Sequence, residues 1–133
     1  MILQKVVDLA IKIKVIERIS GRLRVNVPKI KKIPEEWQVE DENLTSVFFV
    51  IKGVKSVSFS YLTGDVLFIY NQETTNQKKI LRAVRRMIQI AISYRKEFEY
   101  ITADITIDEL KNEIRRMADI IKDEMSELSK LID

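Results

Sequence analysis

Residues 54–70 of the chain read VKSVSFSYLTGDVLFIY, which contains two alternating patterns on either side of a Thr-Gly pair. Every second residue from Val57 to Tyr61 is apolar, and the same spacing recurs from Val66 to Tyr70. A period of two is typical of a strand that buries one face, and Thr63-Gly64 has the spacing of a two-residue hairpin turn. We therefore predict a β-hairpin in which Tyr61 pairs with Val66 and the aromatic residues of both strands face the core.

The region before the hairpin also alternates. Apolar residues recur at odd positions between Ile11 and Val27, and Gly21 interrupts the pattern. A glycine inside a strand pattern indicates a bulge or a bend. We therefore predict one long, kinked strand that ends at Pro28. Its other face carries three polar residues, Arg22, Arg24 and Asn26.

Two stretches have the spacing of helices. Apolar residues recur at helical spacing between Leu44 and Ile51, and Gly53 stands where a left-handed residue would end that helix. Residues 76–96 carry a wider apolar stripe, which predicts a second helix. Alternation at Ile101, Ala103 and Ile105 predicts a closing strand. The order strand, helix, hairpin, helix, strand is that of the ferredoxin-like βαββαβ sandwich, so we predict an α+β fold with one domain at residues 1–105.

A C-terminal helix is predicted for residues 106–133. Thr106 and Glu109 form a capping-box pattern at its start. Its apolar residues follow alternating steps of four and three, the spacing of a coiled-coil seam, although Glu124 interrupts them. This seam favours self-association as an antiparallel or domain-swapped dimer, and it equally suits packing on the same chain. The seam consists of Leu110, Ile114, Met117, Ile121, Leu128 and Leu131.

The composition excludes most catalytic chemistries. The chain has neither histidine nor cysteine, the side chains that supply most general bases, thiol nucleophiles and soft-metal ligands. It also lacks a phosphate-binding glycine loop, a metalloprotease motif and a calcium-loop motif. We therefore predict that the protein is not an enzyme and has no catalytic residue, no metal site and no cofactor.

The balance of residue types is that of a soluble folded protein, because apolar residues make up 46% of the chain and charged residues 32%. No apolar run approaches the length of a membrane span, and the N-terminus lacks the pattern of a signal peptide. The expected location is the cytoplasm, without insertion into a membrane.

Charge is distributed unevenly along the chain. Residues 1–96 contain 18 lysines and arginines against 9 acidic residues, a net charge of +9, whereas residues 97–133 contain 5 against 11, a net charge of −6. The two parts should attract each other, within one chain or between two. Five basic residues form a ridge on the second helix, which we expect to be a solvated face or to meet the acidic C-terminal helix; phosphate or acidic-lipid binding is the minor alternative. This basic ridge consists of Lys78, Lys79, Arg82, Arg85 and Arg86.

Three motifs together resemble a known family. They are Gly21-Arg22-Leu23-Arg24-Val25 in the first strand, Gly53-Val54 after the first helix, and Leu62-Thr63-Gly64-Asp65-Val66-Leu67 in the hairpin. In this order they are similar to heavy-metal-associated (HMA)-like domains, which occur alone or before metal-transporting P-type ATPases, and the match covers roughly residues 12–92. Metal-binding members carry a Cys-x-x-Cys motif between the first strand and the first helix. The corresponding segment here, residues 28–43, contains no cysteine, so the resemblance implies the fold without the metal site.

The outer face of the predicted sheet combines aliphatic, small polar and arginine side chains, a mixture that resembles an interface more than a solvated surface. We therefore predict a protein-interaction or regulatory module, which the resemblance links to metal transport or homeostasis. The alternative for this face is that the C-terminal helix covers it. The alternative functions are a cysteine-independent ligand sensor or metal-handling accessory protein and, as the weakest, a nucleic-acid binder, because the aromatic residues are predicted to face the core. The predicted docking face consists of Arg22, Arg24, Asn26, Ser58, Ser60, Leu67 and Ile69.

Overall fold

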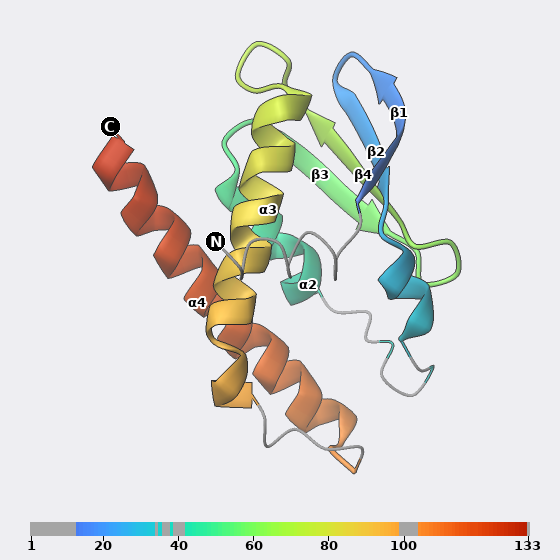
Figure 1. Ribbon diagram of the computed structural model, residues 1–133, viewed down its shortest axis with the longest axis vertical. Helices are drawn as coiled ribbons and strands as arrows, with labels where there is room; N and C mark the ends of the chain where they lie inside the picture. The colour runs from blue at the N-terminus through green and yellow to red at the C-terminus, as the bar shows by residue number, and fades with distance from the viewer. Residues whose placement is uncertain (1–12, 34, 36–37, 39–41, 99–103, 133) are drawn as a thin grey trace.

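The computed structural model describes residues 13–33, 35, 38, 42–98 and 104–132. Within them the protein has an α+β fold, in which helices pack on one face of a four-stranded antiparallel sheet (Figure 1). The strands are β1 (Lys14–Ile19), β2 (Arg22–Asn26), β3 (Val54–Phe59) and β4 (Asp65–Tyr70). The α-helices are α2 (Glu42–Ser46), α3 (Gln77–Ser93) and α4 (Ile107–Ile132), and the 3₁₀ helices are η1 (Pro28–Lys32), η3 (Val47–Val50) and η4 (Arg95–Phe98).

The prediction of one long first strand is wrong, because the chain reverses at Gly21 instead of bending there. β1 and β2 form an antiparallel hairpin in which Ile19 pairs with Arg22, and Ser20 and Gly21 make the turn. Gly21 has a φ of +77°, a left-handed conformation that glycine adopts at little cost and that permits a two-residue turn. The sheet order is therefore β1-β2-β4-β3.

β1 occupies the edge beside β2, where the predicted closing strand would have paired. Ile101 and Ala103 of that prediction lie outside the described residues, and Ile105 is not part of a strand. The edge next to β2 is thus filled by the N-terminal side of the chain.

The central hairpin forms as predicted, but its register differs by two residues. Phe59 pairs with Val66, and Val57 pairs with Phe68. A shift of two residues leaves every side chain on its own face of the sheet. The prediction of which strand residues face the core therefore holds, except that Tyr61 lies in the loop and not in a strand, and the predicted partners differ.

A four-residue loop, residues 61–64, replaces the predicted two-residue turn. The N–H of Ser60 donates to the carbonyl of Asp65 (3.0 Å), and the N–H of Gly64 donates to the carbonyl of Ser60 (2.8 Å). The Ser60 hydroxyl also accepts from the N–H groups of Leu62 and Thr63 (3.2 and 3.3 Å). These local bonds satisfy the loop backbone and favour the wider turn. Gly64 has a φ of +78°, a left-handed conformation that glycine adopts at little cost.

The two internal helices are found where the sequence predicts them. The first consists of α2 followed directly by η3, and it ends before Gly53, whose φ is +96°. The second is α3, whose N-cap Asn76 accepts a hydrogen bond from the N–H of Lys79 at 2.9 Å. It ends at Ser93, earlier than predicted, and η4 follows.

The core lies between the sheet and the helices. Leu23 and Phe68 of the sheet and Ile80 of α3 are at most 1% exposed, and α4 adds Ala118 and Ile121 to the same cluster. Full burial of a large apolar side chain stabilises a fold by roughly 1.5–3 kcal/mol. α4 is therefore a structural part of the core.

The C-terminal helix begins as predicted. The Thr106 hydroxyl accepts from the N–H of Glu109 (3.2 Å) and donates to the Glu109 carboxylate (2.8 Å). The helix then packs against α2, η3 and α3 of the same chain, and the Lys122 ammonium donates to the Ser46 hydroxyl (3.4 Å).

Candidate protein-interaction surface

The strand register places the predicted docking residues on one face of the sheet. Arg24 of β2 lies opposite Leu67 of β4, which lies opposite Ser58 of β3. In the next row Arg22 lies opposite Ile69. Directly opposed residues of neighbouring strands point to the same side of a sheet, so these five side chains form one continuous surface.

Two other predicted docking residues lie at the loop end of this surface. The Asn26 amide donates to the Thr63 carbonyl and to the Asp65 carboxylate, both at 2.8 Å. Ser60 lies just beyond β3, where its hydroxyl serves the loop backbone. Both residues hold the β3–β4 loop in place, and their polar groups are already occupied.

β1 extends the surface with residues that the sequence interpretation missed. Glu17 and Ile19 lie opposite Arg24 and Arg22, on the outer side of the sheet, and Ile19 is 54% exposed. The single-strand prediction placed Ile19 on the core side. Gly21 is the signal that could have corrected this placement, because a turn at Gly21, in place of a bend, makes residues 14–19 a separate strand. We call the combined surface the outer sheet face; it consists of Glu17, Ile19, Arg22, Arg24, Ser58, Leu67 and Ile69.

Two arginines give the outer sheet face its positive charge. Arg22 Nε lies 2.7 Å from Glu17 Oε1 in an ion pair. Within the described part of the chain, Arg24 has no carboxylate partner, and its Nε is enclosed without a hydrogen-bond acceptor. The other N–H groups of this guanidinium can donate charge-assisted hydrogen bonds to an acceptor of another molecule.

The helices α2, α3 and α4 lie on the opposite side of the sheet (Figure 1). Ala118 and Ile121 of α4 join the cluster formed by the inward-facing residues of β2 and β4. The C-terminal helix of the same chain therefore does not cover the outer sheet face.

The predicted oligomerisation seam is partly used inside the chain. Met117 and Ile121 pack on the core, and Leu110 and Ile114 are half-buried. The side chains of Leu128 and Leu131 lie outside the described residues.

Glu124, the acidic interruption of the seam, has a partner on the preceding helix. The phenol of Tyr94 donates a hydrogen bond to Glu124 Oε1 at 2.5 Å. This hydrogen bond and the negative charge of the carboxylate raise the pKa of Tyr94 above its ordinary value of 10.0, because both favour the protonated phenol. Glu124 therefore connects α4 to the C-terminal end of α3 within one chain.

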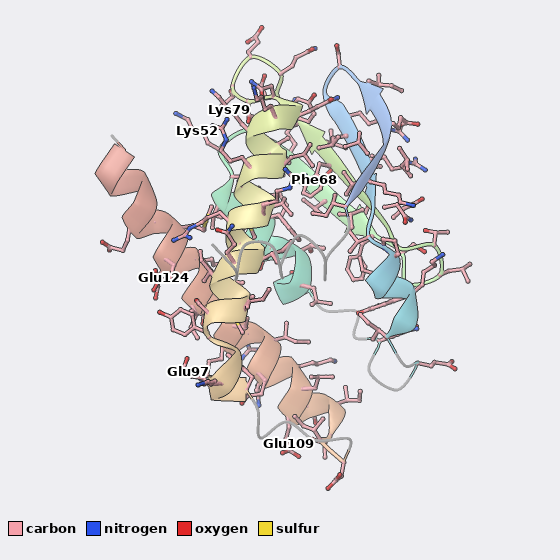
Figure 2. All side chains as sticks on the ribbon, viewed as in Figure 1. Lys52, Phe68, Lys79, Glu97, Glu109 and Glu124 are labelled. Carbon is pink, nitrogen blue, oxygen red and sulfur yellow. The ribbon has the colours of Figure 1, made fainter. Side chains whose placement is uncertain are left out.

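The basic ridge is exposed along α3. No acidic residue occurs in α3, and no ion pair is found for any ridge residue in the described part of the chain. Figure 2 shows Lys79 at the N-terminal end of α3, whereas Glu97 and Glu124 lie toward its other end. The acidic C-terminal helix thus does not pair with the ridge in this arrangement.

No group of three or more acidic side chains is arranged to hold a metal ion among the residues that the structure describes. A search of the same residues finds no helix long and apolar enough to cross a membrane. Comparison with known proteins gives no match: no family model fits the chain, and no curated protein or solved structure is similar enough to be matched.

Proposed function

We propose that this chain is a non-catalytic protein-interaction or regulatory module that binds a protein partner through the outer sheet face. The observation that supports the proposal is the composition of this face. Ile19, Leu67 and Ile69 lie beside two arginines on the side of the sheet that the helices leave uncovered. Arginines and apolar residues are typical of interface cores, from which most other charged residues are depleted.

The chemistry of the face indicates the kind of partner. Apolar side chains of the partner would cover the aliphatic residues, and a carboxylate oxygen would accept from the guanidinium of Arg24, which has no carboxylate partner among the described residues. A charge-assisted hydrogen bond of this kind is stronger than a neutral one. The proposed partner is therefore a protein with an apolar and acidic docking segment.

The proposal includes a ferredoxin-like arrangement of the HMA-like type. It is supported by the succession β2, α2, β3, β4, α3 and by the adjacency of β2, β4 and β3. The segment between β2 and α2 contains no cysteine, so a role in metal transport or homeostasis would consist of binding proteins in the cytoplasm and not of holding the metal.

A second copy of the chain is another partner that we propose. α4 contributes to the core of its own chain, and exchange of α4 between two chains would preserve the same contacts. The net charges of −6 on residues 97–133 and +9 on the rest favour this association.

The substitution Leu67→Glu tests the docking face. Leu67 is half-buried at the middle of that face and points away from the core. We expect the wild-type protein to capture a specific partner from cells of its source, and the variant to bind that partner at least about tenfold more weakly. Quantitative mass spectrometry of the captured proteins, followed by calorimetry with the purified partner, measures the difference.

Arg115→Glu is the matched control, because Arg115 is exposed on α4, on the helical side of the molecule. This variant should bind the partner like the wild type. Equal binding by Leu67→Glu and the wild type, with unchanged melting temperatures, would contradict the proposal.

A further inference from the structure

Two adjoining hollows lie along one flank of α3. The first, of about 720 Å³, is lined by polar residues that include Ser20, Tyr70, Gln72, Thr75 and Asn76. The second, of about 410 Å³, is lined mainly by residues of the basic ridge, Lys78, Arg82, Arg85 and Arg86. Lys78 and Leu81 line both hollows, so the two are continuous. We call them the polar hollow and the basic groove.

Two nearly buried hydroxyl groups line the polar hollow. Thr75 and Tyr70 are each 6% exposed, and both line this hollow. The methyl group of Thr75 lies against Gly53, where a Cβ atom would come within 2.9 Å of it. The two hydroxyl groups can donate hydrogen bonds to a polar molecule in the hollow and accept them from it.

The electrostatics of α3 favour an anion at the same place. The N-terminus of this 17-residue helix lies at Asn76 and carries the positive end of the helix dipole. Cations are unfavourable there, yet Lys78 and Lys79 lie in the first turn and no acidic residue occurs in α3. None of the described residues that line the two hollows is acidic. A bound anion would relieve this repulsion.

We propose that these two hollows form a binding site for a small phosphorylated molecule with more than one phosphate group. Lys78 and Arg82 would bind the phosphates, with the helix N-terminus beside them, and the hydroxyl groups of Thr75 and Tyr70 would bind the neutral polar part. The volumes are within the range of small-molecule sites. Lys78 and Arg82 are one helical turn apart, roughly 6 Å along the axis, so they can contact successive phosphates. This site is separate from the outer sheet face and adds a ligand-sensing role to the proposed function.

Calorimetry on the full chain, with ATP as the probe, tests the site. We expect saturable binding with one ATP per chain, weaker binding of inorganic pyrophosphate, and no binding of adenosine at the same concentrations. Lys78→Gln and Arg82→Gln should each lower the affinity for ATP about tenfold, because each removes a charge-assisted hydrogen bond. Arg115→Gln, on the exposed side of α4, is the matched control and should bind ATP like the wild type.

Thr75→Val separates the site from a general attraction between charges, since it removes a hydroxyl and leaves the charge unchanged. Thr75→Val should weaken the binding of ATP more than that of pyrophosphate. Thr75→Ser keeps the hydroxyl and should bind ATP like the wild type. The absence of saturable ATP binding, or equal affinities in the wild type, Lys78→Gln and Thr75→Val, would overturn the proposal. Binding of RNA or of anionic lipid vesicles without binding of ATP would overturn it as well, by assigning the ridge to a macromolecular surface.

Discussion

Gly64 and Gly21 adopt nearly the same backbone conformation, with φ of +78° and +77°, but their surroundings differ. A Cβ atom on Gly64 would lie 2.8 Å from the carbonyl oxygen of Val27, whereas a Cβ atom on Gly21 would lie 3.4 Å from the carbonyl oxygen of Tyr70. The N–H of Val27 also donates to the Gly64 carbonyl at 2.8 Å, which holds the two segments together. At Gly64 a side chain is therefore opposed both by the backbone angle and by a close backbone atom.

From this difference we predict that Gly64→Ala destabilises the fold by about 1–3 kcal/mol and more strongly than Gly21→Ala. Both substitutions impose the same backbone strain, so Gly21→Ala controls for it. Urea unfolding, followed by circular dichroism, measures the two free energies. Equal losses would mean that the contact between the loop and Val27 is not tight.

The contact between Tyr94 and Glu124 predicts a dependence of stability on alkaline pH. The pKa of Tyr94 is raised in the folded state by its hydrogen bond to Glu124 and by the carboxylate charge. Between the ordinary value of 10.0 and the raised value, the folded state keeps a proton that the unfolded state has lost. The stabilisation is therefore complete below pH 10 and decreases as the pH rises through this window.

Absorbance titration of the phenol groups measures the pKa of Tyr94, with Tyr94→Phe identifying its contribution. Glu124→Gln should lower this pKa toward its ordinary value, because the amide can still accept a hydrogen bond but carries no charge. An unchanged titration in Glu124→Gln would show that the two side chains do not interact in solution.

At the scale of elements, the sequence predicts the β3–β4 hairpin, α3, and the start of α4 because each has its own periodicity or cap. It does not reveal the β1–β2 hairpin, for a specific reason. Across the turn, Ile19 pairs with Arg22, so the core-facing residues of β1 next to the turn have even numbers, whereas those of β2 have odd numbers. A bulge between Val15 and Glu17 shifts the alternation by one residue and returns the core-facing positions of β1 to odd numbers. The two shifts cancel, so the inward-facing Val15, Leu23 and Val25 all have odd numbers, as they would in a single strand.

The residues of the outer sheet face could be predicted only where the strands that carry them were predicted. Arg24, Leu67 and Ser58 were placed together because a register error of two residues does not change the face of a strand. Ile19 was not found, since its place depends on the turn and the bulge together. The polar hollow was not predictable either, because Ser20 in one turn and Thr75 before α3 both line it although they are far apart in the sequence.

At the scale of the whole molecule, α4 completes a core that the sheet and α3 begin. Ala118 and Ile121 are at most 8% exposed, and they join the cluster that contains Phe68 and Met87. The sequence pattern could not distinguish packing on the same chain from packing on a second chain, because an exchanged helix makes the same contacts. The helix is therefore required for the fold in either arrangement.

This requirement gives a prediction for truncated chains. Deletion of residues 107–133 should abolish cooperative unfolding, because the loss of several buried side chains, each worth roughly 1.5–3 kcal/mol, approaches the total stability of a typical domain, about 5–15 kcal/mol. Deletion of residues 128–133 is the matched control: it removes none of the described core contacts, so the shortened protein should melt cooperatively.

Light scattering of the full-length chain distinguishes a helix α4 packed on its own chain from one exchanged between two chains. The mass of a dimer that persists in high salt is expected if α4 is exchanged, because its contacts with the core are apolar and are not screened. A monomer at high micromolar concentration would rule out the exchange and leave α4 packed on its own chain.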